Sequence, residues 1–292
     1  MKKRTREDWV LDSINYALLI IIALVALYPF YYILVLSFNE GTDTTRSGVY
    51  FWPRRFTLDN YHYFFKDPKW TRAFVVTLLR TVIGTGLGVI FTSLVAYGLT
   101  YKDLMFRRTY FVIVLVAMNF SGGIITYYVT LKGLGLLNTF SVYVVPTMLN
   151  LFFLMIALSF FREIPPELGE SARMEGASEW RIFSRIIMPV SMPLLATMSL
   201  FVGSGQWNSW LDAAYFVQDD GLRTLAYRMI EVINQAMLPT DTQSAQIASM
   251  SSVTGMSVQV TAMIISIAPI ICVYPFLQKY FVKGMMLGSV KG

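Results

Sequence analysis

Six stretches of mainly apolar residues divide the chain, and each is long enough to cross a membrane as a helix. About 20 apolar residues span the hydrocarbon core of a bilayer. The stretches lie at residues 14–38, 73–99, 110–128, 142–160, 191–210 and 256–281. This pattern predicts an all-α integral membrane protein with six transmembrane helices. The first stretch is longer than the apolar part of a signal peptide and no small-residue cleavage site follows it, so we expect it to be retained.

Some residues inside these stretches carry structural expectations of their own. Pro29 is expected to kink the first helix. Gly84, Gly86 and Gly88 lie in the second stretch, where small residues let a neighbouring helix approach closely. Arg80 lies in the same stretch, and we expect it to snorkel or to face a protein neighbour.

Composition supports the membrane assignment, and charge sets the orientation. The chain of 292 residues is 55% hydrophobic and 14% charged, whereas a soluble domain carries about 25% charged residues. Its net charge of +6 is explained by Lys and Arg in cytoplasmic loops, without a nucleic-acid partner. With both termini inside, the inner segments hold 14 Lys and Arg and the outer loops hold 9. We therefore expect a multi-pass membrane protein with cytoplasmic termini, and the resemblance described below implies that the membrane is the bacterial inner membrane.

This orientation predicts how the chain is divided. Residues 1–13 form a cytoplasmic N-terminus, residues 14–281 the transmembrane domain, and residues 282–292 a cytoplasmic C-terminal tail. Two long outer loops at residues 39–72 and 211–255 and a long inner loop at residues 161–190 connect the helices.

The inner loop at residues 161–190 has a pattern of its own. Pro165 and Pro166 suit the start of a helix, and Glu167 and Glu170 complement the dipole of its first turn. Gly176 is expected to end this helix. Ser178 is a plausible N-cap for a second helix, in which Trp180, Phe183 and Ile187 form an apolar stripe. The stripe packs either on the membrane surface and the protein's own bundle, or on a soluble partner.

The spacing in this loop resembles a known motif. Glu170-Ser171-Ala172, Gly176, Ile186 and Pro189 match the pattern E-A-A-x3-G-x9-I-x-L-P, with Ser171 in place of the first alanine and Met188 in place of the leucine. The motif is typical of the membrane subunits of binding-protein-dependent ATP-binding-cassette (ABC) importers. The segment SGQWNSWLDA and the ending YPFLQKYFVKGMMLGSVKG resemble the small permease of carbohydrate importers such as the maltose transporter.

The resemblance implies a type I importer permease fold, called MetI-like, with cytoplasmic coupling helices that insert into a cleft of an ATPase. The residues implied to dock the ATPase are Glu170, Ser171, Ala172, Arg173, Gly176, Trp180, Phe183, Ile186 and Pro189. Trp180 and Phe183 are the expected anchors, because aromatic side chains are enriched at interface hot spots. The resemblance also implies a tail that reaches the ATPase interface, formed by Gly288, Ser289, Val290, Lys291 and Gly292.

The chain is not expected to be an enzyme. It contains no G-x-x-x-x-G-K-[ST] loop, so ATP and magnesium belong on a partner ATPase. Cys272 and His62 are the only residues of their kinds, so no metal site or bound cofactor is expected. The implied partners are a second homologous permease, an ATPase dimer, an extracytoplasmic solute-binding protein, a sugar and membrane lipid.

A translocation path is expected to use polar and aromatic residues within the spans, which commonly face the bundle interior or a water-filled cavity. Hydrogen bonding between helices explains such residues equally well. The candidates are Asn119, Ser121, Tyr127, Tyr128, Asn150, Gln206, Trp207 and Asn208. Outside the membrane, the polar residues 234–255 either meet the binding protein or cap the bundle.

Two alternatives stay open at the level of sequence. A secondary, ion-coupled transporter would need carboxylates in the membrane, and only Asp212, at the edge of the fifth stretch, comes near to this. The substrate is the other open question. The C-terminal segment resembles permeases of oligosaccharide systems, including those for uronate-containing sugars and alginate, yet importers of phosphate, spermidine and amino acids share the docking motif.

Overall fold

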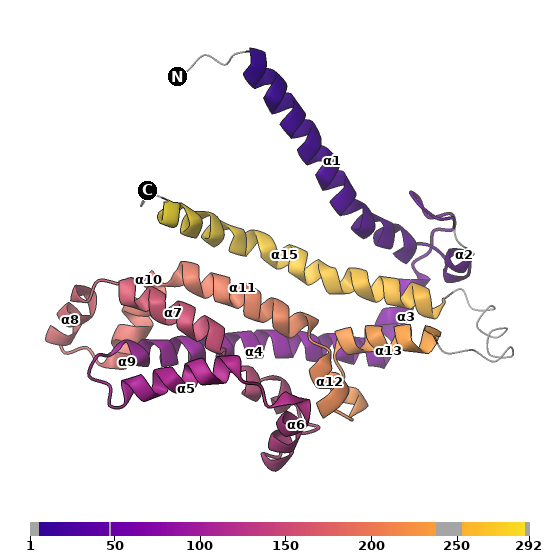
Figure 1. Cartoon of the computed structure of the whole chain (residues 1–292). Coiled ribbons are helices and arrows are strands. Elements are labelled where there is room, and N and C mark those ends of the chain that lie inside the picture. Colours follow the sequence, from indigo (N-terminus) through magenta and orange to yellow (C-terminus); the bar gives the residue numbers. More distant parts are fainter. Residues whose placement is uncertain (1–5, 47, 238–252, 290–292) are drawn as a thin grey trace. The chain divides into compact units, whose positions relative to one another are not determined.

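The computed structural model describes residues 6–46, 48–237 and 253–289, and they are helical almost throughout (Figure 1). Two compact units divide the chain, and each is described here by itself. The first unit comprises residues 1–67 and 229–267, and the second comprises residues 68–228 and 268–292.

The first unit contains the long helix α1 (Arg6–Ser37) and the short helices α2 (Gly41–Thr45) and α3 (Asp59–Lys66). It also holds most of α13 (Leu225–Met237) and the beginning of α15 (Gly255–Ser289). Its buried apolar cluster joins α1 to α15 through Val35, Leu36 and Val260, with Val49 from the loop between α2 and α3. The predicted Pro29 lies inside α1.

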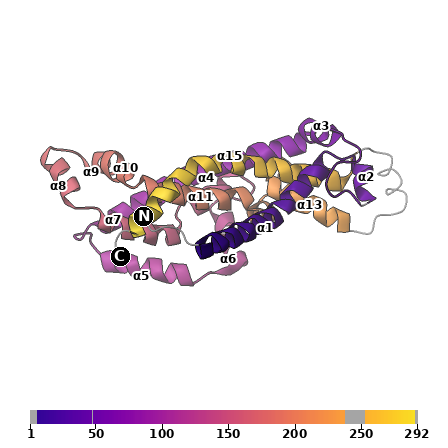
Figure 2. The same ribbon diagram turned by 90° about the horizontal axis from the view of Figure 1, so that it is seen from above.

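The second unit is built around α4 (Pro68–Thr100), which packs along α7 (Leu151–Glu163) and α11 (Met192–Asn208) (Figures 1 and 2). Its other α-helices are α5 (Arg107–Asn119), α6 (Gly123–Gly133), α8 (Glu167–Met174), α9 (Glu179–Ile182), α10 (Met188–Val190) and α12 (Leu211–Phe216). Short turns of other helix types are η1 (Phe140–Tyr143), η2 (Val145–Thr147), η3 (Phe183–Ile187) and η4 (Asp220–Leu222).

Glycines in α4 permit this packing, as predicted for Gly84 and Gly88. A Cβ atom on Gly84 would lie 2.9 Å from Nε2 of Gln206, and one on Gly88 would lie 3.6 Å from the carbonyl oxygen of Thr147. A Cβ atom on Gly86 would meet nothing within 4 Å. Close approach of α11 to α4 therefore depends on Gly84, and Gly86 faces away from this contact.

Three helices in the described part of the chain are long and apolar enough to cross a membrane, at Trp9–Ser37, Pro68–Thr100 and Gly255–Val273. Two bent pairs bring the number to five if each pair is one span. Three of the six predicted spans therefore have a counterpart among the described residues, and five have one if each bent pair is counted as a single broken span.

The prediction of one helix over residues 110–128 is wrong. α5 ends at Asn119, α6 begins at Gly123, and Phe120 between them has extended backbone. Gly123 has φ +74°, a left-handed conformation that glycine adopts without steric cost. The sequence prediction missed this break because it was based on hydropathy, which carries no information about backbone conformation.

The fourth predicted span bends by 42° between η2 and α7. Asn150 caps α7, since its side-chain oxygen accepts a hydrogen bond from the backbone N–H of Phe153 at 3.1 Å. Thr92 on α4 holds this break in place: its hydroxyl donates to the carbonyl oxygen of Met148 and accepts from the N–H of Asn150, each at 3.2 Å.

The fifth predicted span begins where expected, next to Pro193. The helical segment Glu179–Val190 and α11 meet at Ser191 with an angle of 82°. Two segments at this angle cannot both run along the membrane normal, so this pair is a broken span or a re-entrant element and not one straight helix.

Candidate functional site

The loop between α7 and α11 folds as a hairpin of two short helical segments, as its Pro, Gly and Ser pattern predicted. The first segment is α8, and the second runs from α9 through η3 to α10. We call residues 167–190 the inner hairpin. It lies at the end of the second unit away from α12 (Figure 1).

Gly176 forms the turn of the inner hairpin. Its φ is +78°, its N–H donates to the carbonyl oxygen of Arg173 at 2.9 Å, and the N–H of Ala177 donates to that of Ala172 at 2.9 Å. These two bonds make a Schellman motif, which usually has glycine at the left-handed position. Ala172 and Ala177 both pack against the main apolar cluster, which completes the motif.

Ser178 occupies the predicted N-cap position of the second segment. Its carbonyl oxygen accepts from the N–H of Ile182 at 3.0 Å, but its side chain makes no capping hydrogen bond. The prediction was correct for the position of the helix start and wrong for the capping bond.

Four polar side chains fasten the inner hairpin to α4. Arg173 on α8 donates from Nε to Oε1 of Glu179 at 2.7 Å and from Nη2 to the Tyr101 hydroxyl at 2.8 Å. The Tyr97 hydroxyl donates to Oε2 of Glu179 at 2.9 Å, and the Tyr101 hydroxyl bonds to the same oxygen. We call Tyr97, Tyr101, Arg173 and Glu179 the hairpin clamp.

The clamp keeps its charges at ordinary pH. Hydrogen bonds from Arg173, and then from Tyr101 and Tyr97, outweigh the cost of burial and lower the pKa of Glu179 to about 2. The same bond to Glu179, followed by the bond to Tyr101, raises the pKa of Arg173 above its usual range. Arg173 and Glu179 are therefore both ionised near neutral pH.

The two predicted aromatic anchors have different environments. Trp180 is 61% exposed, while Phe183 is 2% exposed and lies in the main apolar cluster. The Phe183 ring contacts those of Tyr97 and Trp180, with centroids 5.4 and 5.8 Å away. The expectation that Phe183 touches a partner is wrong, because this chain already surrounds its side chain. Trp180 keeps a free surface.

The remaining residues of the motif are also divided between buried and exposed positions. Ala172 and Ile186 are half-buried against the apolar cluster. The exposed residues are Glu170, Ser171, Gly176 and Pro189. Met174, which the sequence did not single out, is 89% exposed at the tip. The hairpin thus presents an exposed surface that includes Glu170, Met174 and Trp180.

A second polar cluster lies inside the helices of the second unit, around Arg80. This side chain is 1% exposed and donates to Oε1 of Gln206 at 2.9 Å and to Oδ2 of Asp212 at 2.8 Å. It also lies over the Tyr143 ring, 4.4 Å from the centroid. Of the two expectations for Arg80, the protein neighbour is confirmed and snorkelling is wrong.

This cluster accounts for two of the predicted path residues. Gln206 is buried, and its Nε2 donates to the Thr147 hydroxyl at 2.7 Å. Trp207 is buried, and its ring contacts that of Phe74 at 6.1 Å between centroids. Both side chains join helices within the chain, and Gln206 also lines a cavity of 290 Å³ together with Arg80 and Asn150.

The other predicted path residues are exposed on this chain: Asn119, Ser121, Tyr127, Tyr128, Asn150 and Asn208. Asn119 and Asn208 donate to carbonyl oxygens one turn earlier in their own helices. Ser121 and Tyr127 lie together at a cavity of 440 Å³ that also contains Asp212 and Tyr215.

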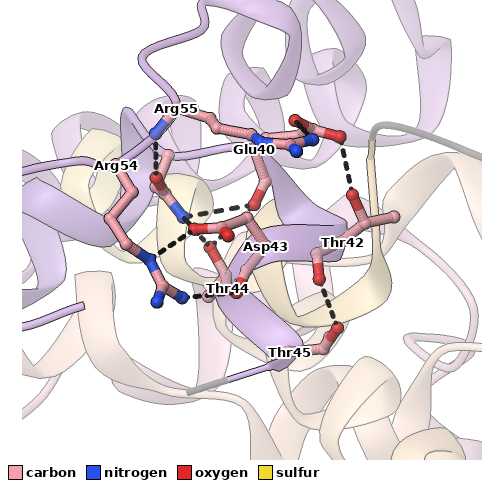
Figure 3. Close-up of polar contacts among 8 residues, drawn as sticks. Glu40, Thr42, Asp43, Thr44, Thr45, Arg54 and Arg55 are labelled. Atoms are coloured by element: carbon pink, nitrogen blue, oxygen red, sulfur yellow. Dashed lines mark hydrogen bonds and ion pairs between the residues drawn. The ribbon is translucent and has the colours of Figure 1, made fainter. Parts of the chain in front are cut away.

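The outer loop at residues 39–72 is folded through a dense polar network (Figure 3). Arg54 and Arg55 donate to Asp43 and Glu40 at 3.0 and 3.1 Å. Asn39 links both sides, since it donates to Asp43 at 3.0 Å and accepts from the N–H of Arg55 at 2.9 Å. The bond from Asn39 lowers the pKa of Asp43, and the bond from Thr42 lowers that of Glu40. Of the second outer loop, residues 238–252 lie outside the described residues.

The C-terminal end differs in part from its predicted form. Residues 282–289, including Gly288 and Ser289, are helical and continue α15, and their position relative to the membrane stays a prediction. Val290, Lys291 and Gly292 lie outside the described residues.

Comparison with known proteins identifies the family. The family model described as "Binding-protein-dependent transport system inner membrane component" matches residues 2–287. The chain belongs to this family. It is the membrane component of an ABC transport system and not the ATPase.

Individual relatives in this permease family cover nearly the whole chain. Protein LplC of Bacillus subtilis (strain 168) is 35% identical over 99% of this chain and 97% of its own length. The polygalacturonan/rhamnogalacturonan transport system permease protein YtcP of the same organism is 33% identical over 98% of this chain and 100% of its own length.

A solved structure matches this permease chain equally well. It is a chain of a bacterial ABC transporter involved in the import of the acidic polysaccharide alginate. The TM-score is 0.86 and the identity 28%, and the match covers 96% of this chain and 100% of that chain.

Sequence reasoning missed three members of the hairpin clamp: Tyr97, Tyr101 and Glu179. Tyr97 lies near the end of α4 and Tyr101 directly follows that helix, 82 and 78 residues before Glu179 in the sequence. A signal was present, since Glu179 follows the predicted N-cap. Nothing in the sequence joined the two segments.

Proposed function

We propose that this permease forms half of the translocation path of an ATP-driven importer for oligosaccharides. It has the six spans of a type I importer permease, with the third span interrupted at Phe120–Gly122 and both termini in the cytoplasm. A second homologous permease supplies the other half of the path. A solute-binding protein delivers the sugar from outside, and an ATPase dimer binds inside.

The inner hairpin is the ATPase docking element in this proposal. One observation carries it: the hairpin is fastened to α4 by the clamp, while Trp180 and Met174 stay exposed at its surface. Coupling needs a rigid contact that has two discrete arrangements. A hairpin bonded to the longest helix of the unit transmits a push from the ATPase to the bundle.

ATP hydrolysis tests this role. The full chain is reconstituted in proteoliposomes with its second permease, ATPase and binding protein, and ATP hydrolysis and sugar uptake are both measured. We expect uptake only with ATP inside and binding protein outside. Uptake by the chain alone, or uptake driven by a proton gradient without ATP, would contradict the proposal.

We further propose that the sugar is acidic and contains uronic acid units. The support comes from relatives: YtcP is named for polygalacturonan and rhamnogalacturonan, and the matched structure belongs to a transporter of alginate. A relative at 28% identity, AraQ of Halalkalibacterium halodurans, is named for arabinooligosaccharides, which makes a neutral sugar the second candidate.

Competition between these sugars separates the candidates. Labelled tri-galacturonate and arabinotriose are offered to the same proteoliposomes, each with the other as unlabelled competitor. Uptake of the galacturonate that arabinotriose does not inhibit supports the acidic class. The opposite preference would contradict it and leave the docking role untouched.

A further inference from the structure

Three arginines gather at the end of the second unit where α5 begins and α7 ends. Arg107 and Arg108 are the first residues of α5, and Arg162 lies in the last turn of α7. Together with Phe111 they line a cavity of 530 Å³. α5 packs on α7, and the two run side by side in both views (Figures 1 and 2). We call these three residues the arginine cluster.

The positive charges of the arginine cluster are not balanced by the described part of the chain. The guanidinium groups of Arg107 and Arg162 lie 5.6 and 5.1 Å from the centre of the same Phe111 ring. No carboxylate among the described residues pairs with any of the three arginines. Nε of Arg107 is buried without a hydrogen-bond partner, which is costly for a charged donor.

The helix dipoles add to this imbalance. Arg162 lies at a helix C-terminus, where a cation is favoured. Arg107 and Arg108 lie at a helix N-terminus, where an anion is favoured, and the first turn of α5 contains no acidic residue. Phe106, at the N-cap position, makes no capping bond. Guanidinium groups and helix dipole therefore converge on one place that favours an anion.

The surface beside the cluster indicates which anion fits. Along α5, directly after the arginines, Tyr110, Val112, Ile113 and Val116 are 46 to 57% exposed. An apolar helix face that begins at a group of cations matches a phospholipid, whose phosphate lies at the interface and whose acyl chains follow the helix. Arginine binds phosphate oxygens bidentately, and basic pockets between helices on the cytoplasmic side bind anionic head groups.

We propose that Arg107, Arg108 and Arg162 bind the phosphate of an anionic phospholipid in the cytoplasmic leaflet. The site lies on the inner side by the distribution of Lys and Arg, the side on which α8 and α9 also lie. This ligand is separate from the transported sugar and touches no part of the hairpin clamp.

Lipid retention tests the site directly. The full chain is purified in detergent, mixed with equal amounts of phosphatidylglycerol and phosphatidylcholine, and examined by native mass spectrometry. We expect the wild-type chain to retain phosphatidylglycerol preferentially. Arg162→Gln should lower this retention about fivefold, because each basic residue near the membrane surface contributes about that factor to binding of an anionic lipid. The double variant Arg107→Gln/Arg162→Gln should retain both lipids equally.

A matched control and two further arms make the result decisive. Lys102→Gln removes one exposed positive charge from the same inner loop, outside the cavity, and should leave retention unchanged. Unchanged phosphatidylcholine binding and a single elution peak identify folded variants, and Arg108→Gln, at an exposed residue of the same cavity, replaces Arg162→Gln if the latter aggregates.

Four outcomes would overturn the proposal. The wild-type chain retains both lipids equally, or Lys102→Gln loses as much as Arg162→Gln. Millimolar inorganic phosphate displaces the lipid, which would make the ligand a free anion. Phosphatidylglycerol is lost when the chain is assembled with its partners, which would mean that a carboxylate of a partner protein occupies the cluster.

Discussion

Arg173 donates to Glu179 across 2.7 Å and so joins the two segments of the inner hairpin on either side of the Gly176 turn. Glu179 also accepts from Tyr97 on α4, and Arg173 donates to Tyr101, the residue that follows α4. The hairpin thus moves together with the longest helix of its unit, which is the property that a coupling element needs.

Glu179→Gln tests the clamp. The amide keeps the shape and loses the charge, so the bonds to Arg173 and Tyr97 weaken. Because this pair is partly exposed, we expect a cost of about 0.2–1 kcal/mol. Hydrogen exchange of residues 167–190 should rise by up to about fivefold, while α11 stays protected. If residues 167–190 exchanged at the same rate in the wild type and in Glu179→Gln, the clamp would not hold the hairpin.

The pH dependence of the clamp follows from the lowered pKa of Glu179. A carboxylate whose pKa falls on folding stabilises the fold above its unfolded pKa and loses this contribution as pH falls through the folded pKa. The unfolded value is 4.5 and the folded value about 2, so the loss occurs between these two values. Protection of residues 167–190 should therefore be constant from about pH 5 to pH 8. A step in protection within that range would contradict the assignment.

Gly176→Val tests the turn. The left-handed φ of +78° costs an L-residue about 1–2 kcal/mol and a β-branched one more. We expect the variant to insert normally and to hydrolyse ATP with less sugar transported per ATP. Gly176→Asn is the matched control, since asparagine tolerates this conformation, and it should transport like the wild type. If the valine and asparagine variants transported the same amount of sugar per ATP, the left-handed turn at Gly176 would not be needed for coupling.

Asp212→Asn tests the buried cluster around Arg80. It leaves a guanidinium that is 1% exposed without its ionic partner, and because Asp212 is 26% exposed the cost should be lower than the roughly 3–5 kcal/mol of a fully buried pair. Thermal unfolding in detergent should begin several degrees lower. Asp103→Asn, at an exposed position, is the control and should unfold at the wild-type temperature. If Asp212→Asn also unfolded at the wild-type temperature, the ion pair would contribute nothing to stability and the prediction would be wrong.

Two glycines one helical half-turn apart test the packing of α4. Gly84→Ala forces a Cβ atom to within 2.9 Å of Nε2 of Gln206, whose bonds to Arg80 and Thr147 resist displacement, so stability should fall. Gly86→Ala meets nothing within 4 Å and should raise helix stability by up to about 1 kcal/mol. Thermal unfolding of the isolated chain measures the stability of both variants. If Gly84→Ala were more stable than Gly86→Ala, the close packing of α4 against Gln206 at Gly84 would be contradicted.

Local patterns in the sequence predicted local structure well. Pro165, Gly176 and Ser178 marked the ends of the hairpin segments, because proline, glycine and serine act on the backbone at their own positions. The break at Gly123 was also local, but a prediction based on apolar runs passed over it. Adjacent glycines inside an apolar run deserve more weight than hydropathy gives them.

Contacts between distant segments could not be predicted in the same way. Arg80 and Asp212 are 132 residues apart, and Tyr97 and Glu179 are 82 apart. The sequence showed that Arg80 needed a partner but did not name one. Phe183 and Trp180 looked equivalent on a helical stripe, and only packing distinguishes the buried ring from the exposed one.

The affinity of the ATPase for the permease tests most directly whether the inner hairpin is the docking surface. Trp180→Ala removes a side chain that is 61% exposed, so folding should be unaffected while the ATPase binds at least about 30-fold more weakly, as for an interface hot spot of about 2 kcal/mol. Phe183→Ala should instead lower thermal stability. Wild-type ATPase affinity in folded Trp180→Ala would contradict the account.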